Sequence, residues 1–268
     1  MIEGWSEYPE RGLAFLVSTL VEDFIVMRLV RTILFTVSMA SITQTLPGKT
    51  PAPLLVDPAA LPPTKSVPVF GQRIVYYDVG SGPTVVLLHG VGSQAMFDWG
   101  QVIMPLSQSH RVIALDQIGF GESDKPLIDY SIQTFVDFLG EFLRTVGVQQ
   151  FTLAGESLGG WIAASYSIQA LAPGNTGAYA LPEPQRLILV DAPGQSDSSE
   201  TIGDKLAGIT VPTLVVCGGN DELIPLNQGR EYATKISKAK LVIIQECGHV
   251  PPLEKPEAFL SAVTPFLK

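Results

Sequence analysis

The chain has 268 residues, of which 46% are hydrophobic and 16% are charged, and its net charge is -9. This composition indicates a packed globular protein rather than a disordered one. The length fits one α/β domain of about 200 to 250 residues with an appendage. The negative charge argues against nucleic acid as a partner, because phosphate binding requires a basic surface.

Residues 13–46 are strongly apolar. Within them, Met27 is followed by two arginines, a short apolar run and the small-residue triplet Ser38-Met39-Ala40. This order of charged start, apolar centre and cleavage triplet is typical of a secretory signal. The alternative is an amphipathic helix that stays attached and associates with a membrane, because the apolar run is short for a transmembrane span. We therefore expect export or envelope association, with a cytoplasmic location as the alternative.

Residues 47–68 are rich in proline and are interpreted as an extended linker. We accordingly divide the chain into an N-terminal segment with its linker, 1–66, and a catalytic domain, 67–268. The sequence does not indicate the oligomeric state.

In the catalytic domain, short runs rich in Val, Ile and Leu alternate with longer stretches of helical pattern. The predicted strands are 73–79, 84–90, 111–116, 151–155, 186–191, 213–218 and 240–244. The predicted helices are 131–146, 158–171, 226–238 and 256–267. Continuous apolar strands of this kind suit a parallel sheet covered on both faces, and the alternation predicts right-handed crossovers.

The stretch Gly155-Glu156-Ser157-Leu158-Gly159 fits the pattern G-x-S-x-G, between a predicted strand and a predicted helix. Glycines at these positions permit a tight strand-to-helix turn that holds the serine in a strained, exposed position. The backbone N–H of Leu158 would then point from a helix start toward a developing oxyanion. We expect Ser157 to be a nucleophile.

A serine hydroxyl needs a base, usually a histidine that a carboxylate orients. His249 is the only histidine that follows Ser157, and it lies just past the last predicted strand. Asp221, a few residues beyond the strand 213–218, is the favoured acid. Asp191, at the end of the strand 186–191, is the alternative.

The loop after the strand that begins at residue 84 supplies a second oxyanion donor, for which we expect the Val91 N–H. In the same loop His89 is expected to be structural. Phe97 and Trp99 after this loop, and Trp161 after the serine, are candidates for contact with substrate or for core packing.

The three histidines and the two cysteines give no metal signature. His89, His110 and His249 have no ligand-like spacing, and His110 is expected at the surface. Cys217 and Cys247 are too few for a disulfide framework; they are bonded or, as we favour, buried free thiols. We expect neither a metal nor a cofactor.

Over roughly residues 67–268 the chain resembles the α/β-hydrolase superfamily. Five features carry the resemblance in order: HGVGS, DQIGFGESDKP, GESLGGW, GGNDELIP and GHVPPLEKPEAF. The resemblance implies an eight-stranded, mostly parallel sheet with helices on both faces. It also implies a Ser157–His249–Asp221 triad with Val91 and Leu158 as the oxyanion hole. Serine at the nucleophile position is typical of the esterases, lipases, amidases and carbon–carbon bond hydrolases of this superfamily.

Related enzymes usually insert a helical cap after the sixth strand, where this chain has only the polar residues 192–210. We therefore expect a minimal or absent cap. The site is then either open, or covered by the apolar segment 13–46 as a lid.

The sequence thus favours a cofactor-free serine hydrolase that acts on a small-molecule carboxylic ester. One alternative is cleavage of a carbon–carbon bond in a diketone-like acid. The other is a non-catalytic binding module on the same fold.

Overall fold

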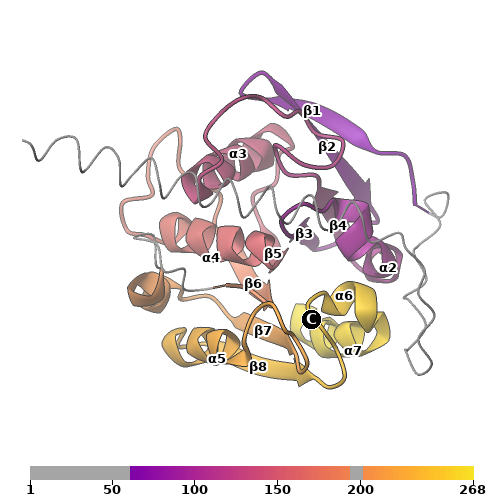
Figure 1. Ribbon diagram of the computed structural model, residues 1–268. Helices are drawn as coiled ribbons and strands as arrows, with labels where there is room; N and C mark the ends of the chain where they lie inside the picture. Colours follow the sequence, from indigo (N-terminus) through magenta and orange to yellow (C-terminus); the bar gives the residue numbers. More distant parts are fainter. Residues whose placement is uncertain (1–60, 194–201) are drawn as a thin grey trace, which may run out of the picture. The chain divides into compact units, whose positions relative to one another are not determined.

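The computed structural model describes residues 61–193 and 202–268, and its centre is one eight-stranded sheet (Figure 1). The strands are β1 (Lys65–Val69), β2 (Gln72–Val79), β3 (Thr84–Leu88), β4 (Arg111–Leu115), β5 (Phe151–Glu156), β6 (Pro184–Val190), β7 (Thr213–Gly218) and β8 (Ala239–Ile244). Their order is β1-β2-β4-β3-β5-β6-β7-β8. Pairing is antiparallel from β1 to β2 and from β2 to β4, and parallel between all other neighbours. The predicted fold class is confirmed.

The strand β1 corrects the last residues of the predicted extended linker, 47–68, of which 47–60 lie outside the described residues. Residues 65–69 pair with β2 in register from Lys65 opposite Tyr76 to Val69 opposite Gln72. The strand was missed because it is short, contains Pro68 and is largely exposed, so the apolar alternation is weak. Such an edge strand tolerates a proline, which cannot donate to the ladder.

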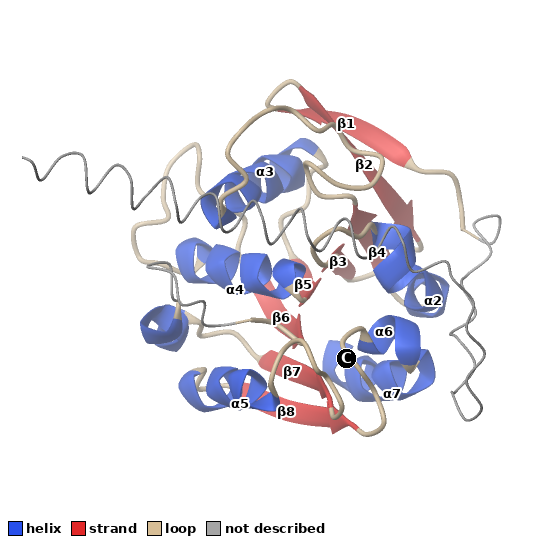
Figure 2. Ribbon diagram, viewed as in Figure 1, coloured by secondary structure: helices blue, strands red, loops and turns tan. Residues whose placement is uncertain are grey.

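Helices cover both faces of the sheet (Figure 2). They are α2 (Ala95–Ser107), α3 (Ile132–Thr145), α4 (Leu158–Ala170), α5 (Leu226–Lys235), the short α6 (Pro251–Glu254), α7 (Pro256–Leu267) and the 3-10 helix η2 (Gly203–Gly208). One apolar core lies between the sheet and α3, α4 and α5. A second core lies on the opposite face, where α2 and α7 pack. Because β3 to β8 run parallel, their carboxyl ends lie at the same edge of the sheet, and the loops at this edge bring together residues that are distant in sequence.

The helix α2 was not predicted. Gly100 and Pro105 lie inside it, and Gln94, the N-cap residue just before it, makes no capping hydrogen bond through its side chain. These features weaken the start and interior signals by which a helix is identified. In contrast α3 begins after Ser131, whose hydroxyl accepts a hydrogen bond from the Thr134 N–H at 3.2 Å.

One other side chain, His110, differs from expectation, and for Trp99 the structure decides between two alternatives. His110 is buried, with 6% of its surface exposed, and its Nδ1 lies 2.8 Å from the Ser109 hydroxyl. Trp99 is fully buried in α2 and meets Phe259 edge to face, so it belongs to the core rather than to a substrate pocket. His110 therefore corrects the expectation of a surface position, and its backbone N–H donates to the Leu106 carbonyl in the last turn of α2 at 3.1 Å.

Cys217 and Cys247 are both buried free thiols. Cys217 belongs to the core beneath α5, whereas Cys247 belongs to the core beneath α7. The two thiols thus belong to opposite faces of the sheet, which is consistent with their being unbonded.

The expected signal, membrane helix or lid within 13–46 lies outside the described residues. Residues 194–201 of the short connection 192–210 also lie outside the described residues. Of the rest of this connection, Gly203–Gly208 form η2. Among the helices of residues 61–193 and 202–268, none has the length and apolar character needed to cross a membrane.

Candidate active site

Ser157 occupies a sharp turn between β5 and α4. Its φ is 51° and its ψ is -119°, a conformation that L-residues rarely adopt. The turn is held by the Ser157 N–H, which donates to the Val190 carbonyl oxygen at 2.9 Å. A Cβ at Gly155 would overlap the Gly159 carbonyl, and a Cβ at Gly159 would overlap the carbonyls of Leu88 and His89. The glycines are therefore required because two backbones approach closely.

The predicted strain at Ser157 is present, but the predicted exposure is not. Only 8% of the Ser157 surface is exposed. Leu158, the first residue of α4, lies next to it with its N–H at the positive end of the helix.

The structure brings Ser157, His249 and Asp221 into one hydrogen-bonded row. The His249 Nε2 lies 2.9 Å from the Ser157 Oγ, and the His249 Nδ1 lies 2.8 Å from the Asp221 Oδ2. These residues follow β5, β7 and β8 at the carboxyl edge of the sheet, where β7 and β8 are neighbours and β6 lies between β5 and β7. The arrangement can pass a proton from the hydroxyl to the imidazole while a carboxylate orients the ring.

Asp221 is held as a carboxylate by several donors. Its Oδ1 accepts the N–H groups of Leu223 at 2.8 Å and Ile224 at 3.0 Å, which leaves Oδ2 for His249. Burial alone would raise the pKa of Asp221, but the hydrogen bonds from His249 and from these N–H groups outweigh it and lower the pKa. Asp221 is therefore ionised at neutral pH and can stabilise a charged imidazole.

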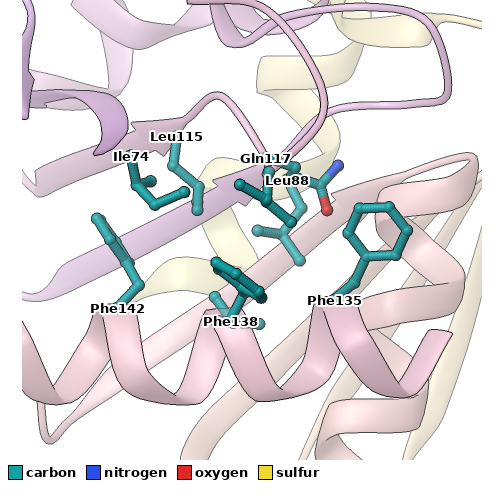
Figure 3. Close-up of a pocket in the computed structure, with 9 residues that line it drawn as sticks. Ile74, Leu88, Leu115, Gln117, Phe135, Phe138 and Phe142 are labelled. Carbon is teal, nitrogen blue, oxygen red and sulfur yellow. The ribbon is translucent and has the colours of Figure 1, made fainter. Parts of the chain in front are cut away.

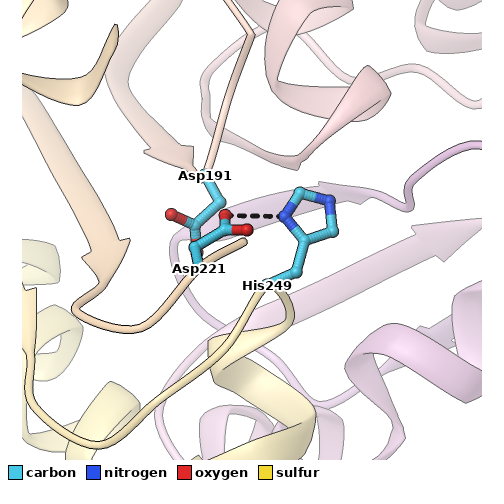
Figure 4. A group of neighbouring side chains, drawn as sticks. All are labelled: Asp191, Asp221 and His249. Atoms are coloured by element: carbon cyan, nitrogen blue, oxygen red, sulfur yellow. Dashed lines mark hydrogen bonds and ion pairs between the residues drawn. The ribbon is translucent and has the colours of Figure 1, made fainter. Parts of the chain in front are cut away.

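Asp191, the alternative acid, lies beside this row without joining it (Figure 4). Both of its carboxyl oxygens face the Gly218 N–H, at 3.1 and 3.0 Å. Burial raises the pKa of Asp191 to about 8, against the Gly218 hydrogen bond, and the nearby Asp221 charge raises it further. Asp191 therefore carries a proton at neutral pH.

Asp191, Asp221 and His249 could together offer three ligand atoms within 4.8 Å of one another to a metal ion. The hydrogen bonds argue for another role. One ring nitrogen of His249 faces Asp221 and the other faces Ser157, so both are already engaged. This donor set suits proton transfer better than metal binding.

The loop between β3 and α2 is fixed by buried polar groups. The Gln117 N–H donates to the His89 Nε2 at 3.0 Å, so the ring proton is on Nδ1, which faces the Gly90 carbonyl at 2.7 Å. Burial lowers the pKa of His89, which is neutral here. The Gly90 N–H donates to the Asp98 Oδ2 at 2.8 Å. His89 is thus structural, as the sequence predicted.

Val91 and Leu158, the predicted oxyanion donors, each adjoin a residue at the turn: Leu158 follows Ser157, and Val91 follows Gly90, whose Cβ position lies 3.2 Å from the Ser157 Cβ. Val91 follows the fixed Gly90, and Leu158 begins α4. Within the described part of the chain, no hydrogen bond occupies either backbone N–H. Both donors are therefore free for an oxyanion.

Glu156, which the sequence reasoning did not single out, is a buried acid at the centre of the site. It is 1% exposed, and its Oε1 lies 3.5 Å from the His249 Nε2. Burial raises the pKa of Glu156 well above its ordinary value, and the negative charge of Asp98 adds to this. The sequence signal was an acidic residue at the end of a strand whose pattern predicts full burial.

The two candidate aromatic contacts have different surroundings. Phe97 is 42% exposed in the first turn of α2. Trp161 is half-buried and packs against the core beneath α4. Their contact with substrate stays a prediction.

The described part of the chain has a small cavity and a surface groove, both away from Ser157, His249 and Asp221. One is an apolar cavity of about 10 Å³ between α3 and the sheet, lined by Phe135, Phe138 and Leu115 among others (Figure 3). It has room for about one water molecule. The other is a surface groove of about 480 Å³ lined in part by Phe70 and Tyr179. Neither is lined by Ser157, Asp221 or His249.

Comparison with known proteins identifies the fold and its relatives. The sequence model of the α/β hydrolase fold family matches residues 83–176 and 194–256, more than half of the chain. An uncharacterized protein of Mycobacterium tuberculosis is 36% identical over 127 residues, which are 47% of this chain and 34% of that protein. The chain thus matches about a third of the length of this relative.

Two further proteins are similar over most of their length. The 2-hydroxy-6-oxo-6-(2'-aminophenyl)hexa-2,4-dienoic acid hydrolase of Metapseudomonas resinovorans is 25% identical, over 74% of this chain and 88% of that protein. A thermophilic esterase from Thermogutta terrifontis has a similar structure, with a TM-score of 0.68 and 20% identity over 77% of this chain and 98% of that one. At that identity the structural likeness concerns the fold alone.

Proposed function

The chain belongs to the α/β hydrolase fold family, and we propose that it is a serine hydrolase that cleaves carboxylic esters through an acyl-enzyme intermediate. The observation that carries the proposal is the hydrogen-bonded row of Ser157, His249 and Asp221. A strained serine, a base within reach of its hydroxyl and an ionised acid behind the base are the parts that nucleophilic acyl transfer requires.

In the proposed reaction, His249 takes the proton of Ser157 as the Oγ attacks the ester carbonyl carbon. The N–H groups of Val91 and Leu158 stabilise the oxyanion. The proton on His249 then passes to the leaving alcohol, and an acyl-enzyme remains. Water, deprotonated by His249, releases the acid and restores Ser157. Asp221 keeps the ring in the orientation and tautomer that both steps need.

The test is hydrolysis of p-nitrophenyl esters from acetate to palmitate by the full chain and by Ser157→Ala. We expect turnover by the full chain and a loss of about 10⁴-fold or more in kcat for the variant, with an unchanged circular dichroism spectrum. Activity retained by the folded Ser157→Ala variant would remove Ser157 from the mechanism.

A second candidate function is cleavage of a carbon–carbon bond in a diketone-like acid. The similarity to the dienoic acid hydrolase of Metapseudomonas resinovorans over 88% of its length favours it. The same preparations are assayed on a 2-hydroxy-6-oxo-dienoic acid. Turnover of this acid at a kcat/KM above that of every ester would replace the ester proposal by this one.

A binding module without catalytic activity is the remaining alternative. A fluorophosphonate reagent labels only an activated serine, so modification of Ser157 in the folded chain argues against it. Absence of labelling would favour the binding module.

A further inference from the structure

The carboxyl group of Glu156 has no role in the proposed reaction, and one of its oxygens is buried without a hydrogen-bond partner in the described part of the chain. The side chain is 2% exposed, and its Oε1 has no hydrogen-bond partner within the described residues. A buried polar atom without a partner is rare, because it forfeits its hydration. The His249 Nε2 lies 3.5 Å from this Oε1, and the same nitrogen faces the Ser157 hydroxyl.

The other oxygen of Glu156 lies toward the loop after β3. A Cβ at Gly90 would overlap the Glu156 Oε2, and the Gly90 N–H donates to the Asp98 Oδ2. Asp98 is also hydrogen-bonded to the Ser93 hydroxyl, at 2.5 Å. Oε2 is therefore on the side of Asp98, and Oε1 is on the side of His249.

The groups around Glu156 keep it neutral. Acidic side chains face it from several elements: Asp98 from α2, Asp191 after β6 and Asp221 after β7. Among the described residues, the basic group that forms an ion-pair contact with it is His249. Burial first, and the charge of Asp98 second, raise the pKa of Glu156 well above its ordinary value. With its proton shared toward Asp98, Glu156 presents Oε1 to His249 as a neutral carbonyl oxygen.

We propose that Glu156 is a positioning residue whose Oε1 accepts a hydrogen bond from the His249 Nε2–H after His249 has taken the proton of Ser157; this rests on the proposed serine hydrolase function. In the resting state the lone pair of Nε2 accepts the Ser157 hydroxyl, so Nε2 has no proton to donate to Oε1, which agrees with their separation of 3.5 Å. The hydrogen bond exists only once Nε2 is protonated. An interaction of this kind stabilises the transition state more than the ground state, and so raises kcat.

Neutrality of Glu156 also lets the reaction finish. The Oγ–H bond of Ser157 breaks, Nε2–H forms, and the Oγ electron pair makes the new bond to the carbonyl carbon. When the tetrahedral intermediate collapses, the bond to the leaving oxygen breaks and that oxygen takes the proton from Nε2. A neutral carbonyl oxygen is too weak a base to retain this proton, whereas an ionised carboxylate would compete for it.

The experiment compares Glu156→Gln with Glu156→Leu, two substitutions of similar size. Glutamine keeps a carbonyl oxygen toward His249 and an N–H toward Asp98, whereas leucine keeps neither. The measurements are the second-order rate at which a fluorophosphonate modifies Ser157, followed by mass spectrometry, and kcat and KM for p-nitrophenyl acetate. Circular dichroism and the thermal midpoint report whether each variant is folded; if the leucine variant is not, Glu156→Met replaces it.

We expect Glu156→Gln to stay within about threefold of the wild type in both rates. We expect Glu156→Leu to lose about tenfold in the labelling rate and in kcat with KM unchanged, because a hydrogen bond to a charged group is lost. Equal rates for leucine and wild type, or a glutamine variant as slow as the leucine variant, would overturn the inference.

The same measurements separate this inference from the proposed function. If the wild type turns over no ester but Ser157 is modified with the expected order of rates, the ester proposal fails and the role of Glu156 stands. If the wild type hydrolyses esters and the leucine substitution changes nothing, only the inference fails. If Ser157 is not modified in the folded wild type, both fail.

Discussion

Asp191 lies beside Asp221 at the carboxyl edge of the sheet, and of these two carboxyl groups only Asp221 is hydrogen-bonded to His249 (Figure 4). Asp221 is held by the backbone N–H groups of Leu223 and Ile224. Asp191 faces the Gly218 N–H instead. The two acids therefore differ in their bonds and in their protonation, although they are neighbours.

This difference predicts unequal effects of two matched substitutions on activity. Asp221→Asn is expected to lower kcat by about 10⁴-fold, because an amide favours the wrong tautomer of His249. Asp191→Asn is expected to stay within about tenfold of the wild type, because it replaces a protonated carboxyl by a neutral amide. Ester hydrolysis at pH 7 measures both. A larger loss for Asp191→Asn than for Asp221→Asn would assign the acid to Asp191.

The raised pKa of Asp191 predicts a dependence of stability on pH. The ordinary pKa of 3.8 applies to the unfolded chain, and the folded pKa is about 8. Between these values the folded state holds a proton that the unfolded state has lost, so the contribution of Asp191 to stability falls as pH rises through this window. Above about pH 8 both states are ionised and the contribution is constant.

Asp191→Asn removes this titration. Its free energy of unfolding, relative to the wild type, is therefore expected to increase from pH 5 to pH 8 and to level off beyond. Urea unfolding at several pH values measures this, with the substitution of the exposed Asp129 by Asn as the control that should show no such trend. A stability difference independent of pH would mean that Asp191 is ionised in the folded state.

Because two backbone segments approach closely at Gly159, any side chain at this position is expected to lower the free energy of unfolding. Gly159→Ala would place a Cβ against the carbonyl oxygens of Leu88 and His89, and overpacking of this kind costs about 1–3 kcal/mol. Gly174→Ala is the matched control, since nothing lies within 4 Å of its Cβ position. Thermal unfolding should separate the two. Equal midpoints would show that the turn has room to relax.

Burial of both thiols predicts slow modification of the folded protein. Burial raises the pKa of Cys217 and of Cys247 to about 12, and only the thiolate reacts quickly. A chromogenic disulfide reagent at pH 8 is expected to modify both thiols in denaturant and neither at a comparable rate in the native state. Rapid reaction of one equivalent in the folded chain would contradict the buried position of that cysteine.

Some of the site was predictable from local pattern. A glycine-flanked serine between an apolar strand and a helix predicts a sharp turn whatever the rest of the chain does, because two neighbouring elements determine it. The β1 strand and α2 were not predictable in this way. β1 is short and largely exposed, and α2 contains a glycine and a proline, so their stability comes from contacts with the rest of the fold.

By itself, the sequence determined the parallel α/β architecture and the strained turn at Ser157, because strand and helix periodicities are properties of short segments. Only the tertiary structure decided which acid meets His249, since the Asn220 N–H binds the Cys247 carbonyl at 2.8 Å and so joins the loops that carry Asp221 and His249. It likewise decided that Glu156 lies buried beside His249. The groups that bury an acid and the charges that act on it come from residues far apart in the chain, and only the fold brings these residues together.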